Sequence, residues 1–205
     1  MSLLENNLSE FTALLESKSA VPGGGGASAL VAAIGISLGT MVGNLTVGKK
    51  KYADVEDDIK ILMQKSERLR LELLELIDGD ALAFEPLSKA YAISKDDPSR
   101  DSIMEDCLKT AAGVPMQIAR LSSGAIELQK AYAEMGSKIA ISDAGTGVSF
   151  CLAALNGAAL NVKINTALMK DRKFAEELEA ELSKLLGKYR KMADEVYSLV
   201  EGRIS

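Results

Sequence analysis

Asp80 is the residue whose type and position point most directly to chemistry. It falls within a stripe that steps by four and three along residues 55–87 and is otherwise made of apolar or small side chains. A lone ionised carboxylate among apolar neighbours is costly. Asp80 therefore either pairs with a lysine or with hydrogen-bond donors, or the stripe opens onto a cleft. A salt-bridged structural aspartate, or a helix kink near Gly79, remains open as the alternative.

The chain contains no histidine. This removes the commonest general base, the commonest metal ligand and every nucleophile arrangement that depends on imidazole. Any catalysis must therefore use Asp, Glu, Lys, Tyr or Cys.

Four polar side chains flank or interrupt a second region of interest, the uncharged segment 144–162. Ser142 and Asp143 precede it, and the structural interpretation is that Ser142 is a helix N-cap while Asp143 complements the helix dipole. Asn161 and Asn165 are spaced four apart, so they share one face of a helix. Their amides need partners in so apolar a segment, which indicates a polar strip that faces a ligand or another helix.

The turn Pro22-Gly23-Gly24-Gly25-Gly26 precedes a helix, where exposed backbone amides can hold a carboxylate or a phosphate. A flexible turn that caps the helix is the alternative. A loose dinucleotide fingerprint begins at Gly24, but it follows a helix rather than a strand and is rejected. At the other end of this segment, one or two of Lys49, Lys50 and Lys51 could meet an anionic substrate tail, and the remainder are solvated end charges.

Apolar residues recur at helical spacing through almost the whole chain, and no segment alternates as a strand does. We predict an all-α, multi-helix bundle. Two apolar helices rich in small residues, within 21–48 and 144–162, are buried and surrounded by long amphipathic helices. Pro115 should kink or split the helix that runs from Asp101 to Tyr132. The last helix has a heptad-like seam and should pack on the outside of the bundle or on a second subunit.

The two uncharged segments also allow a membrane interpretation, since residues 21–48 are followed by three lysines. The Pro-Gly turn, the interspersed Ser, Thr and Asn residues and the charged outer faces of the other helices argue against it. We therefore expect no membrane association. Purification of the chain in the soluble fraction without detergent tests this.

Length and composition indicate one domain spanning residues 1–205. The net charge of −5 argues against nucleic acid as a main partner. Cys107 and Cys151 are far from any metal or redox spacing, so neither a disulfide framework nor a metal site is expected, and a reducing cytoplasm fits. The first ten residues lack the features of a signal peptide.

Taken together, these patches resemble the cyclodeaminase family, which includes the C-terminal half of formiminotransferase-cyclodeaminase, free-standing bacterial cyclodeaminases and methenyltetrahydrofolate cyclohydrolases. Each motif is weak alone, but six in the family's order are specific. The matching stretches are Pro22-Gly23-Gly24-Gly25, residues 41–52 (MVGNLTVGKKKY), residues 80–84 (DALAF), Val114-Pro115, Ser142-Asp143 and residues 157–165 (GAALNVKIN).

The resemblance implies an all-helical, homodimeric enzyme that uses no metal or redox cofactor and binds folate in a cleft lined by the Gly-rich turn. The implied reaction is the cyclodeamination of 5-formimino-tetrahydrofolate to 5,10-methenyl-tetrahydrofolate and ammonia. Hydrolysis of the methenyl compound to 10-formyl-tetrahydrofolate at the same site is the alternative. The departures are a fourth glycine, Gly26, and the lack of a formiminotransferase domain ahead of this chain.

The resemblance also assigns candidate roles. Asp80 and Asp143 are the candidate catalytic carboxylates, one acting on the nucleophile or leaving group and the other balancing the cationic carbon. Asn44, Asn161 and Asn165 would orient the pterin, and Lys49 or Lys50 would hold the tail of a substrate that can be polyglutamylated. The remaining candidate substrate-binding residues are Pro22, Gly23, Gly24, Gly25 and Ser142.

A function of another class stays open, a non-catalytic helical scaffold that dimerises through its last helix. A buried Asp80 and two asparagines do not suit a plain scaffold, because such polar groups are costly without a purpose. Binding of a reduced folate would separate the two hypotheses.

Overall fold

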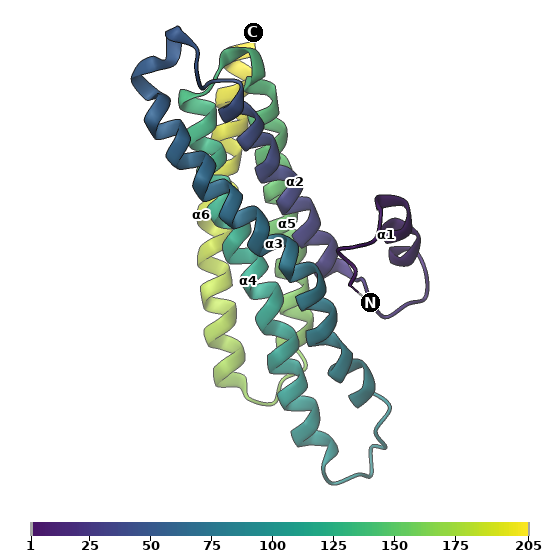
Figure 1. Cartoon of the computed structure of the whole chain (residues 1–205). Coiled ribbons are helices and arrows are strands. Elements are labelled where there is room, and N and C mark those ends of the chain that lie inside the picture. Colours follow the sequence, from purple (N-terminus) through teal and green to yellow (C-terminus); the bar gives the residue numbers. More distant parts are fainter. Residues whose placement is uncertain (1, 205) are drawn as a thin grey trace.

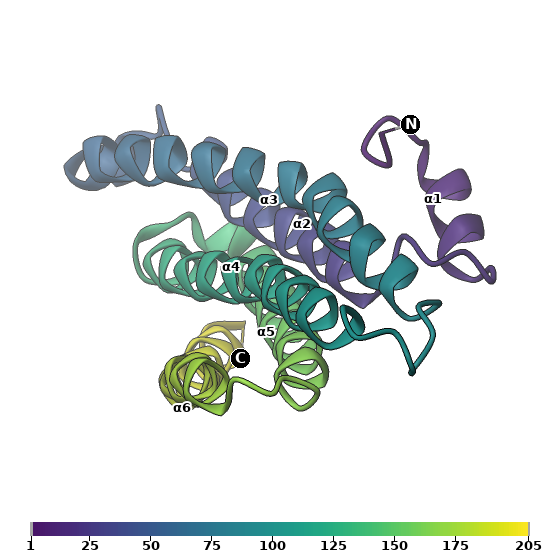
Figure 2. The ribbon, with the colours of Figure 1, turned by 90° about the horizontal axis from the view of Figure 1, so that it is seen from below.

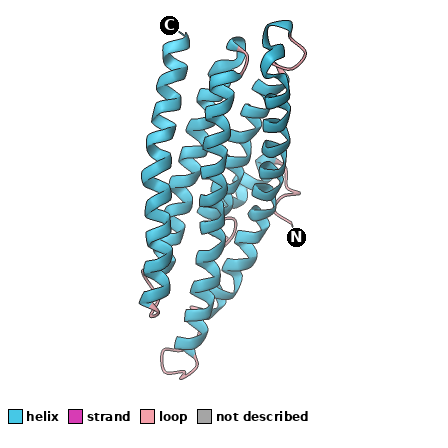
Figure 3. Ribbon diagram, turned by 90° about the vertical axis from the view of Figure 1, so that its left-hand side faces the viewer, coloured by secondary structure: helices cyan, strands magenta, loops and turns pink. Residues whose placement is uncertain are grey.

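The computed structural model describes residues 2–204, which fold into an elongated bundle of helices (Figure 1). No strand occurs in this range, as Figure 3 shows by colour. Five long helices, α2 to α6, build the bundle within this range, and the short helix α1 lies beside it (Figure 2). The bounds are α1 Leu8–Leu15, α2 Gly24–Asn44, α3 Glu56–Ala90, α4 Arg100–Met135, α5 Ile141–Thr166 and α6 Arg172–Ile204, with 3-10 turns at Lys50–Val55 and Lys138–Ala140. The predicted all-α bundle is confirmed.

Helices α2 and α5 are the two apolar, small-residue-rich helices, and they pack closely along their length. A Cβ atom built on Gly35 of α2 would lie 2.7 Å from Cys151 Sγ and 2.9 Å from the Gly147 carbonyl oxygen of α5. Only glycine therefore allows the two backbones to approach this far. Gln129 of α4 closes the contact, because its Nε2 donates to the Gly35 carbonyl at 2.6 Å. Burial of the two helices is partial, however, since each keeps one exposed face.

Helices α3 and α4 form the amphipathic layer that the stripes predicted. On α3 the stripe residues Ile59, Ser66 and Leu73 are fully buried. Ser66 is satisfied by the hydroxyl of the buried Tyr132 on α4, at 3.0 Å. Charged side chains occupy the outer faces, so these helices bury one side and solvate the other.

Two local predictions need correction. Pro115 does not split α4, which runs without a break from Arg100 to Met135. Ser142 is not an N-cap, because α5 begins two residues earlier than expected and Ala140 holds the cap position. The first helix, α1, starts at Leu8, where Asn7 and Glu10 form a reciprocal capping box. Asp143 does lie in the first turn of α5, where a carboxylate complements the dipole.

Two segments are long and apolar enough to cross a membrane by composition alone. They are Gly24–Asn44 and Lys138–Thr166, and 56% and 44% of their most apolar stretches are buried inside the bundle. The core helices of a helical bundle have the same composition. Each of the two helices also keeps exposed apolar side chains, which are described below.

Candidate active site

The carboxylate of Asp80 lies against the first turn of α2. Its Oδ2 accepts a hydrogen bond from the Gly26 N–H at 2.9 Å. The N-cap of α2 is Gly23, which has no side chain to cap the helix. Asp80 of α3 therefore caps α2 in place of a local N-cap side chain. Its carboxylate also faces the positive end of the helix dipole.

The glycines of the turn are needed because polar side chains approach the backbone there. A Cβ on Gly25 would lie 2.2 Å from Asp80 Oδ1, and a Cβ on Gly24 would lie 2.9 Å from Asn161 Nδ2. A Cβ on Gly23, by contrast, would meet nothing within 4 Å. The glycine run thus makes room for two of the predicted site residues, Asp80 and Asn161.

Pro115 and Asn165 belong to one arrangement. A proline has no N–H, so the carbonyl of Ala111, four residues before it in α4, lacks its usual helical donor. Asn165 of α5 replaces that donor, because its Nδ2 donates to the Ala111 oxygen at 3.1 Å and also to the Asn161 oxygen at 2.9 Å. Both amide hydrogens are used in this way. The Oδ1 of Asn165 has no protein donor among residues 2–204 and remains free to accept from a ligand.

These groups line a cavity of about 160 Å³, which we call the Asp80 pocket. Four helices meet there: the start of α2, the second half of α3, the middle of α4 and the end of α5. Its polar groups are Asp80, Asn161 and Asn165, and its apolar wall includes Phe84, Pro115 and Ile164. The sequence predicted the polar residues, whereas Phe84 and Ile164 have no role in the sequence analysis beyond their place in the quoted motifs.

Burial sets the protonation behaviour of the pocket. Desolvation raises the pKa of Asp80 above its ordinary value, and the hydrogen bond from Gly26 opposes that rise. The carboxyl is consequently easier to protonate than a solvated aspartate. No lysine or arginine forms an ion pair with it among the described residues, so its only neutralising partner is the helix terminus.

Asn44, Lys49, Lys50, Ser142 and Asp143, which the sequence also predicted as site residues, lie at the opposite end of the bundle. Asn44 is in the last turn of α2, and Lys49 and Lys50 follow it. Lys49 Nζ lies 3.3 Å from Ser137 Oγ, just before the exposed Ser142 and the half-buried Asp143 at the start of α5. Within one chain the structure therefore separates Asp143 from Asp80. Pro22 is buried in the turn before α2 and does not line the Asp80 pocket.

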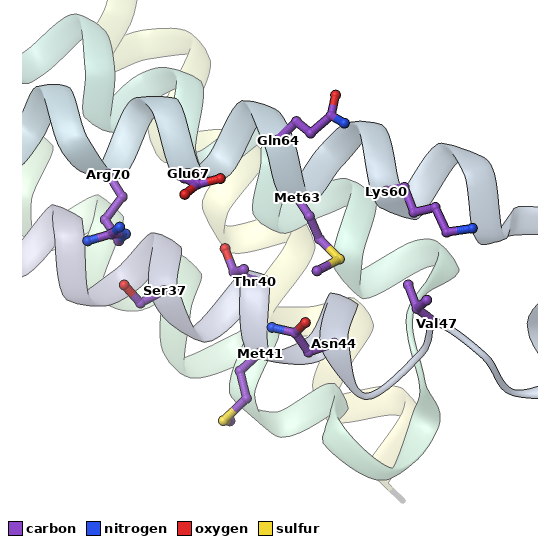
Figure 4. Close-up of a pocket in the computed structure, with 10 residues that line it drawn as sticks. All are labelled: Ser37, Thr40, Met41, Asn44, Val47, Lys60, Met63, Gln64, Glu67 and Arg70. Atoms are coloured by element: carbon purple, nitrogen blue, oxygen red, sulfur yellow. The ribbon is translucent and has the colours of Figure 1, made fainter.

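A larger hollow lies on the outer side of α2 and α3, with a volume of about 730 Å³. We call it the α2–α3 groove. Figure 4 shows Ser37, Thr40 and Asn44 of α2 along one wall and Lys60, Met63 and Arg70 of α3 along the other. Of these, the sequence singled out Asn44 alone as a site residue. Arg70 was missed because nothing in its spacing distinguishes it from the other charged residues of an amphipathic helix.

The two thiols and the carboxylates form no metal site. Within residues 2–204, no three Cys, Asp or Glu side chains come together as metal ligands would. Cys151 is fully buried, and burial raises the pKa of its thiol to about 12. A thiol with so high a pKa is a poor nucleophile near neutral pH. Asp80 is therefore the group in these pockets best suited to proton transfer.

Comparison with known proteins gives the same assignment over nearly the whole chain. The family described as formiminotransferase-cyclodeaminase matches residues 7–184. A methenyltetrahydrofolate cyclohydrolase of Methylorubrum extorquens is 40% identical over 195 residues, which cover 93% of this chain and 94% of that protein. A formimidoyltransferase-cyclodeaminase of Mus musculus is 30% identical over 206 residues; the match covers 98% of this chain but 38% of the mouse protein.

A solved structure is also similar. The formiminotetrahydrofolate cyclodeaminase of Thermotoga maritima superposes with a TM-score of 0.91 at 30% identity, and the match covers 98% of both chains. The resemblance inferred from six short motifs thus extends to the fold and to the full length of the chain.

Proposed function

The chain belongs to the formiminotransferase-cyclodeaminase family, and from that membership we propose that it makes or opens the 5,10-methenyl bridge of tetrahydrofolate at the Asp80 pocket. The observation that carries this proposal is the placement of Asp80, which is held by the Gly26 N–H beside Asn161 and Asn165 in a partly buried cavity. Enzymes of this family act on folates, and we propose that this one needs no resident metal or redox cofactor.

Both reactions pass through a tetrahedral carbon between N5 and N10 of the folate. When the ring opens, water adds to the methenyl carbon and loses a proton, and the carbon–N5 bond then breaks as N5 gains one. When the ring closes, N10 attacks the formimino carbon and loses a proton, and ammonia then leaves with one. One group that first accepts and then returns a proton serves either sequence. We assign both steps to Asp80, whose raised pKa makes the protonated form accessible.

The neighbouring amides would hold the substrate rather than transfer protons. The free Oδ1 of Asn165 can accept a hydrogen bond from an N–H of the pterin, and Asn161 lies one helical turn away on the same wall. The methenyl carbon carries positive charge, which the ionised Asp80 stabilises before the nucleophile adds. Fixed donors and acceptors of this kind need no reorganisation during the reaction.

A separate observation favours each of the two candidate reactions. The cyclohydrolase reaction is favoured by the 40% identity to a relative of the same length that is named for it. The cyclodeaminase reaction, which the sequence analysis put first, is favoured by the fold match to the Thermotoga maritima protein, also of the same length. The sequence and the pocket leave both open, because the tetrahedral intermediate is similar in the two cases.

One experiment tests the function and its direction. The purified protein is offered 5-formimino- and 5,10-methenyl-tetrahydrofolate separately, and the methenyl absorbance is followed. A rise with the first substrate identifies the cyclodeaminase, and an accelerated fall with the second identifies the cyclohydrolase. If neither substrate is turned over and no reduced folate binds, the scaffold hypothesis replaces the enzyme.

Replacement of Asp80 by asparagine separates chemistry from folding. An asparagine oxygen can still accept from the Gly26 N–H, but it cannot take a proton from water or from N10. We expect Asp80→Asn to lower kcat by a factor of about 10² to 10⁴, the usual contribution of a general acid–base group. Circular dichroism should show unchanged helix content. Near-normal turnover in this variant would contradict the assignment.

We also propose that the chain forms a homodimer through the uncovered surface of α2 and α5. The exposed large side chains there are Ile34, Met41, Leu45, Phe150, Leu160 and Ile164, and we call this surface the α2–α5 face. Neither α2 nor segment 144–162 contains a charged residue. Large exposed apolar side chains that gather on one side of a molecule are typical of a contact with another protein. Its self-complementary occupant is a second copy of the chain.

A further inference from the structure

Two hollows of the molecule meet at Val21, just before the glycine turn. One is the Asp80 pocket, with a volume of about 160 Å³, and Val21 forms part of its wall. The other has a volume of about 400 Å³ and lies between α3 and the first residues of the chain; we call it the α3 notch. Its lining includes Val21 as well as Ser2, Leu3, Asp78 and Leu82. A single side chain therefore belongs to the walls of both hollows.

Val21 ends a segment, residues 2–21, that we call the strap. The strap contains α1 and lies beside the five long helices (Figure 2). Residues 12–20 are all exposed, and Leu8 of α1 is 70% exposed. Phe11 is the one side chain of the strap that is buried. A segment with so little burial opens at a lower cost in free energy than the helices of the core.

Asp78 of α3 fastens the strap to the bundle. Its Oδ2 accepts a hydrogen bond from Ser2 Oγ and its Oδ1 accepts one from the Leu3 N–H, both at 2.5 Å. Among residues 2–204, the other hydrogen bonds of the strap stay within it, as in the capping box of α1 and the bond from Ser19 Oγ to the Val21 oxygen. Hydrogen bonds to a carboxylate are stronger than neutral ones, so Asp78 holds this end of the strap in place.

The strap in this position leaves little room beside Asp80. Pockets that bind drug-sized ligands have volumes of roughly 300–1,000 Å³, and the Asp80 pocket is smaller. Ala20 and Val21 are the residues of the strap that line it. If these two residues move outward, the pocket loses one wall and joins the α3 notch. The site then gains room without any change in the long helices.

We propose that the strap is a movable wall of the Asp80 pocket, which Asp78 holds closed and which opens to admit the substrate. The inference rests on the proposed function for the identity of that substrate, a reduced folate. Asp78 is a positioning residue, because it acts on the pocket through the strap and does not line the pocket itself. Closure of the strap after binding limits the access of bulk water to Asp80 and to the methenyl carbon.

Trypsin reports the opening of the strap, because Lys18 is the only lysine or arginine between residues 2 and 48. Cleavage after Lys18 follows the population of the open strap when opening and closing are fast. We expect Asp78→Ala to speed this cleavage by about tenfold to a hundredfold, since it removes two hydrogen bonds to a carboxylate. Lys95 is the internal control. It is exposed in the turn between α3 and α4, and cleavage there should keep its wild-type rate.

Asp78→Asn separates the two hydrogen bonds from a general effect on α3. The asparagine oxygen can accept from the Leu3 N–H, and its amide can donate to Ser2 Oγ. We therefore expect cleavage at Lys18 close to the wild-type rate in this variant. Equal cleavage at Lys18 in the wild type and in Asp78→Ala, or faster cleavage at Lys18 and Lys95 alike, would overturn the role of Asp78.

A reversible cross-link tests whether the strap must open for turnover. Ser2→Cys and Leu82→Cys place two thiols in the α3 notch, one on the strap and one on α3, and Cys107→Ser removes the accessible native thiol. A short bis-methanethiosulfonate joins them, and mass spectrometry identifies the linked protein. We expect the link to lower folate turnover by about tenfold or more, as when a lid cannot open, and dithiothreitol to restore it. The two single-cysteine variants, treated in the same way, are the controls and should stay active.

The outcomes separate this inference from the proposed function. Full turnover by the cross-linked protein overturns the movable wall and leaves the proposed function intact. If the wild type turns over neither folate, the proposed function fails. The trypsin comparison needs no substrate, so it still decides in that case whether Asp78 holds the strap closed. Circular dichroism of each variant shows whether the long helices are retained.

Discussion

At the scale of single residues, the site depends on glycines, because their lack of a side chain lets polar groups approach the backbone. Gly25 permits Asp80 to reach the Gly26 N–H, and Gly24 leaves room for Asn161. The carboxylate thereby caps a helix that has no capping side chain of its own. In the sequence, Gly24 and Gly25 could simply form a flexible turn. In the structure, they are required because no larger residue fits beside Asp80 and Asn161.

Gly25→Ala should accordingly disable the site. The added methyl would lie 2.2 Å from Asp80 Oδ1, so the carboxylate must move away from the Gly26 N–H. We expect turnover to fall by about 10²-fold or more, as for a misplaced catalytic group. Gly113→Ala in α4 is the control, since a Cβ there meets nothing within 4 Å and alanine should stabilise the helix by about 1 kcal/mol. Steady-state kinetics and thermal unfolding of both variants give the comparison.

The raised pKa of Asp80 predicts the pH dependence of the reaction. If the ionised carboxylate accepts the first proton, kcat/KM rises with pH through the pKa of Asp80, at a pH above the range of a solvated aspartate. No histidine is present to add a second transition near pH 6.5, a value typical of imidazole. A pH–rate profile in which kcat/KM falls with pH through this region would assign Asp80 as the initial acid instead.

The same shift has a consequence for stability. The folded pKa of Asp80 lies above its unfolded value, so the protonated form favours folding. This contribution is fully present below the unfolded pKa and is lost as pH rises through the folded pKa. Asp80→Asn should therefore be at least as stable as the wild type at neutral pH, although it is inactive. Denaturant unfolding at neutral and acidic pH measures the difference.

At the scale of elements, a backbone hydrogen bond that is missing in one helix is replaced by a side chain of another helix. Pro115 leaves the Ala111 carbonyl of α4 without its donor, and Asn165 of α5 supplies one. The sequence showed both residues and predicted a kink or a split at the proline. It could not show the repair, because the partner lies on a helix 50 residues further along the chain and the contact depends on how α4 and α5 pack.

Pro115→Ala tests this arrangement. Alanine restores an N–H that can donate to Ala111, so Asn165 loses a fixed partner and its Oδ1 is no longer held toward the pocket. We expect unchanged or increased thermal stability together with a several-fold rise in KM for folate. An unchanged KM, measured beside the Gly113→Ala control, would show that Asn165 is positioned by other contacts.

The helices themselves could be predicted well, and the site only in part. Stripes that step by three and four define α3, α4 and α6, because amphipathic helices bury one face and solvate the other. Asp80, Asn161 and Asn165 were identified because polar side chains interrupt apolar faces. Arg70 gave no such signal on a charged face. The separation of Asn44 and Asp143 from Asp80 arises from helix length and direction, which residue types alone do not reveal.

At the scale of the whole molecule, the exposed apolar surface requires a partner. Ile164, which lines the Asp80 pocket, is 62% exposed, and Leu160, one helical turn before it, is 69% exposed. Charged side chains cover the outer faces of α3, α4 and α6, whereas α2 and segment 144–162 contain no charged residue. Dimerisation through this face would cover the rim residues and enclose the pocket at the same time.

Ile34→Glu should therefore yield a monomer. The substitution places a carboxylate on the α2–α5 face of each chain, and dimerisation through that face would bury these charges without partners, which is strongly unfavourable. We expect sedimentation to show the mass of one chain, helix content to be retained, and turnover to fall to near background. Ile61→Glu is the matched control, because Ile61 of α3 is also about half exposed but lies outside the face and the groove.

The two cysteines differ in exposure, so the distance between spin labels on two chains can be measured in the assembly. Cys151 is sealed in the core, whereas Cys107 of α4 is partly accessible, so a spin label will attach to one position in each chain. Cys107 lies near the Asp80 end of the bundle, well away from the level of Ile34. Opposed subunits would hold two such labels more than about 50 Å apart, at 1.5 Å per helical residue, and side-by-side subunits would hold them at the same end. A pulsed dipolar measurement on the unmutated chain can therefore report which way its copies point.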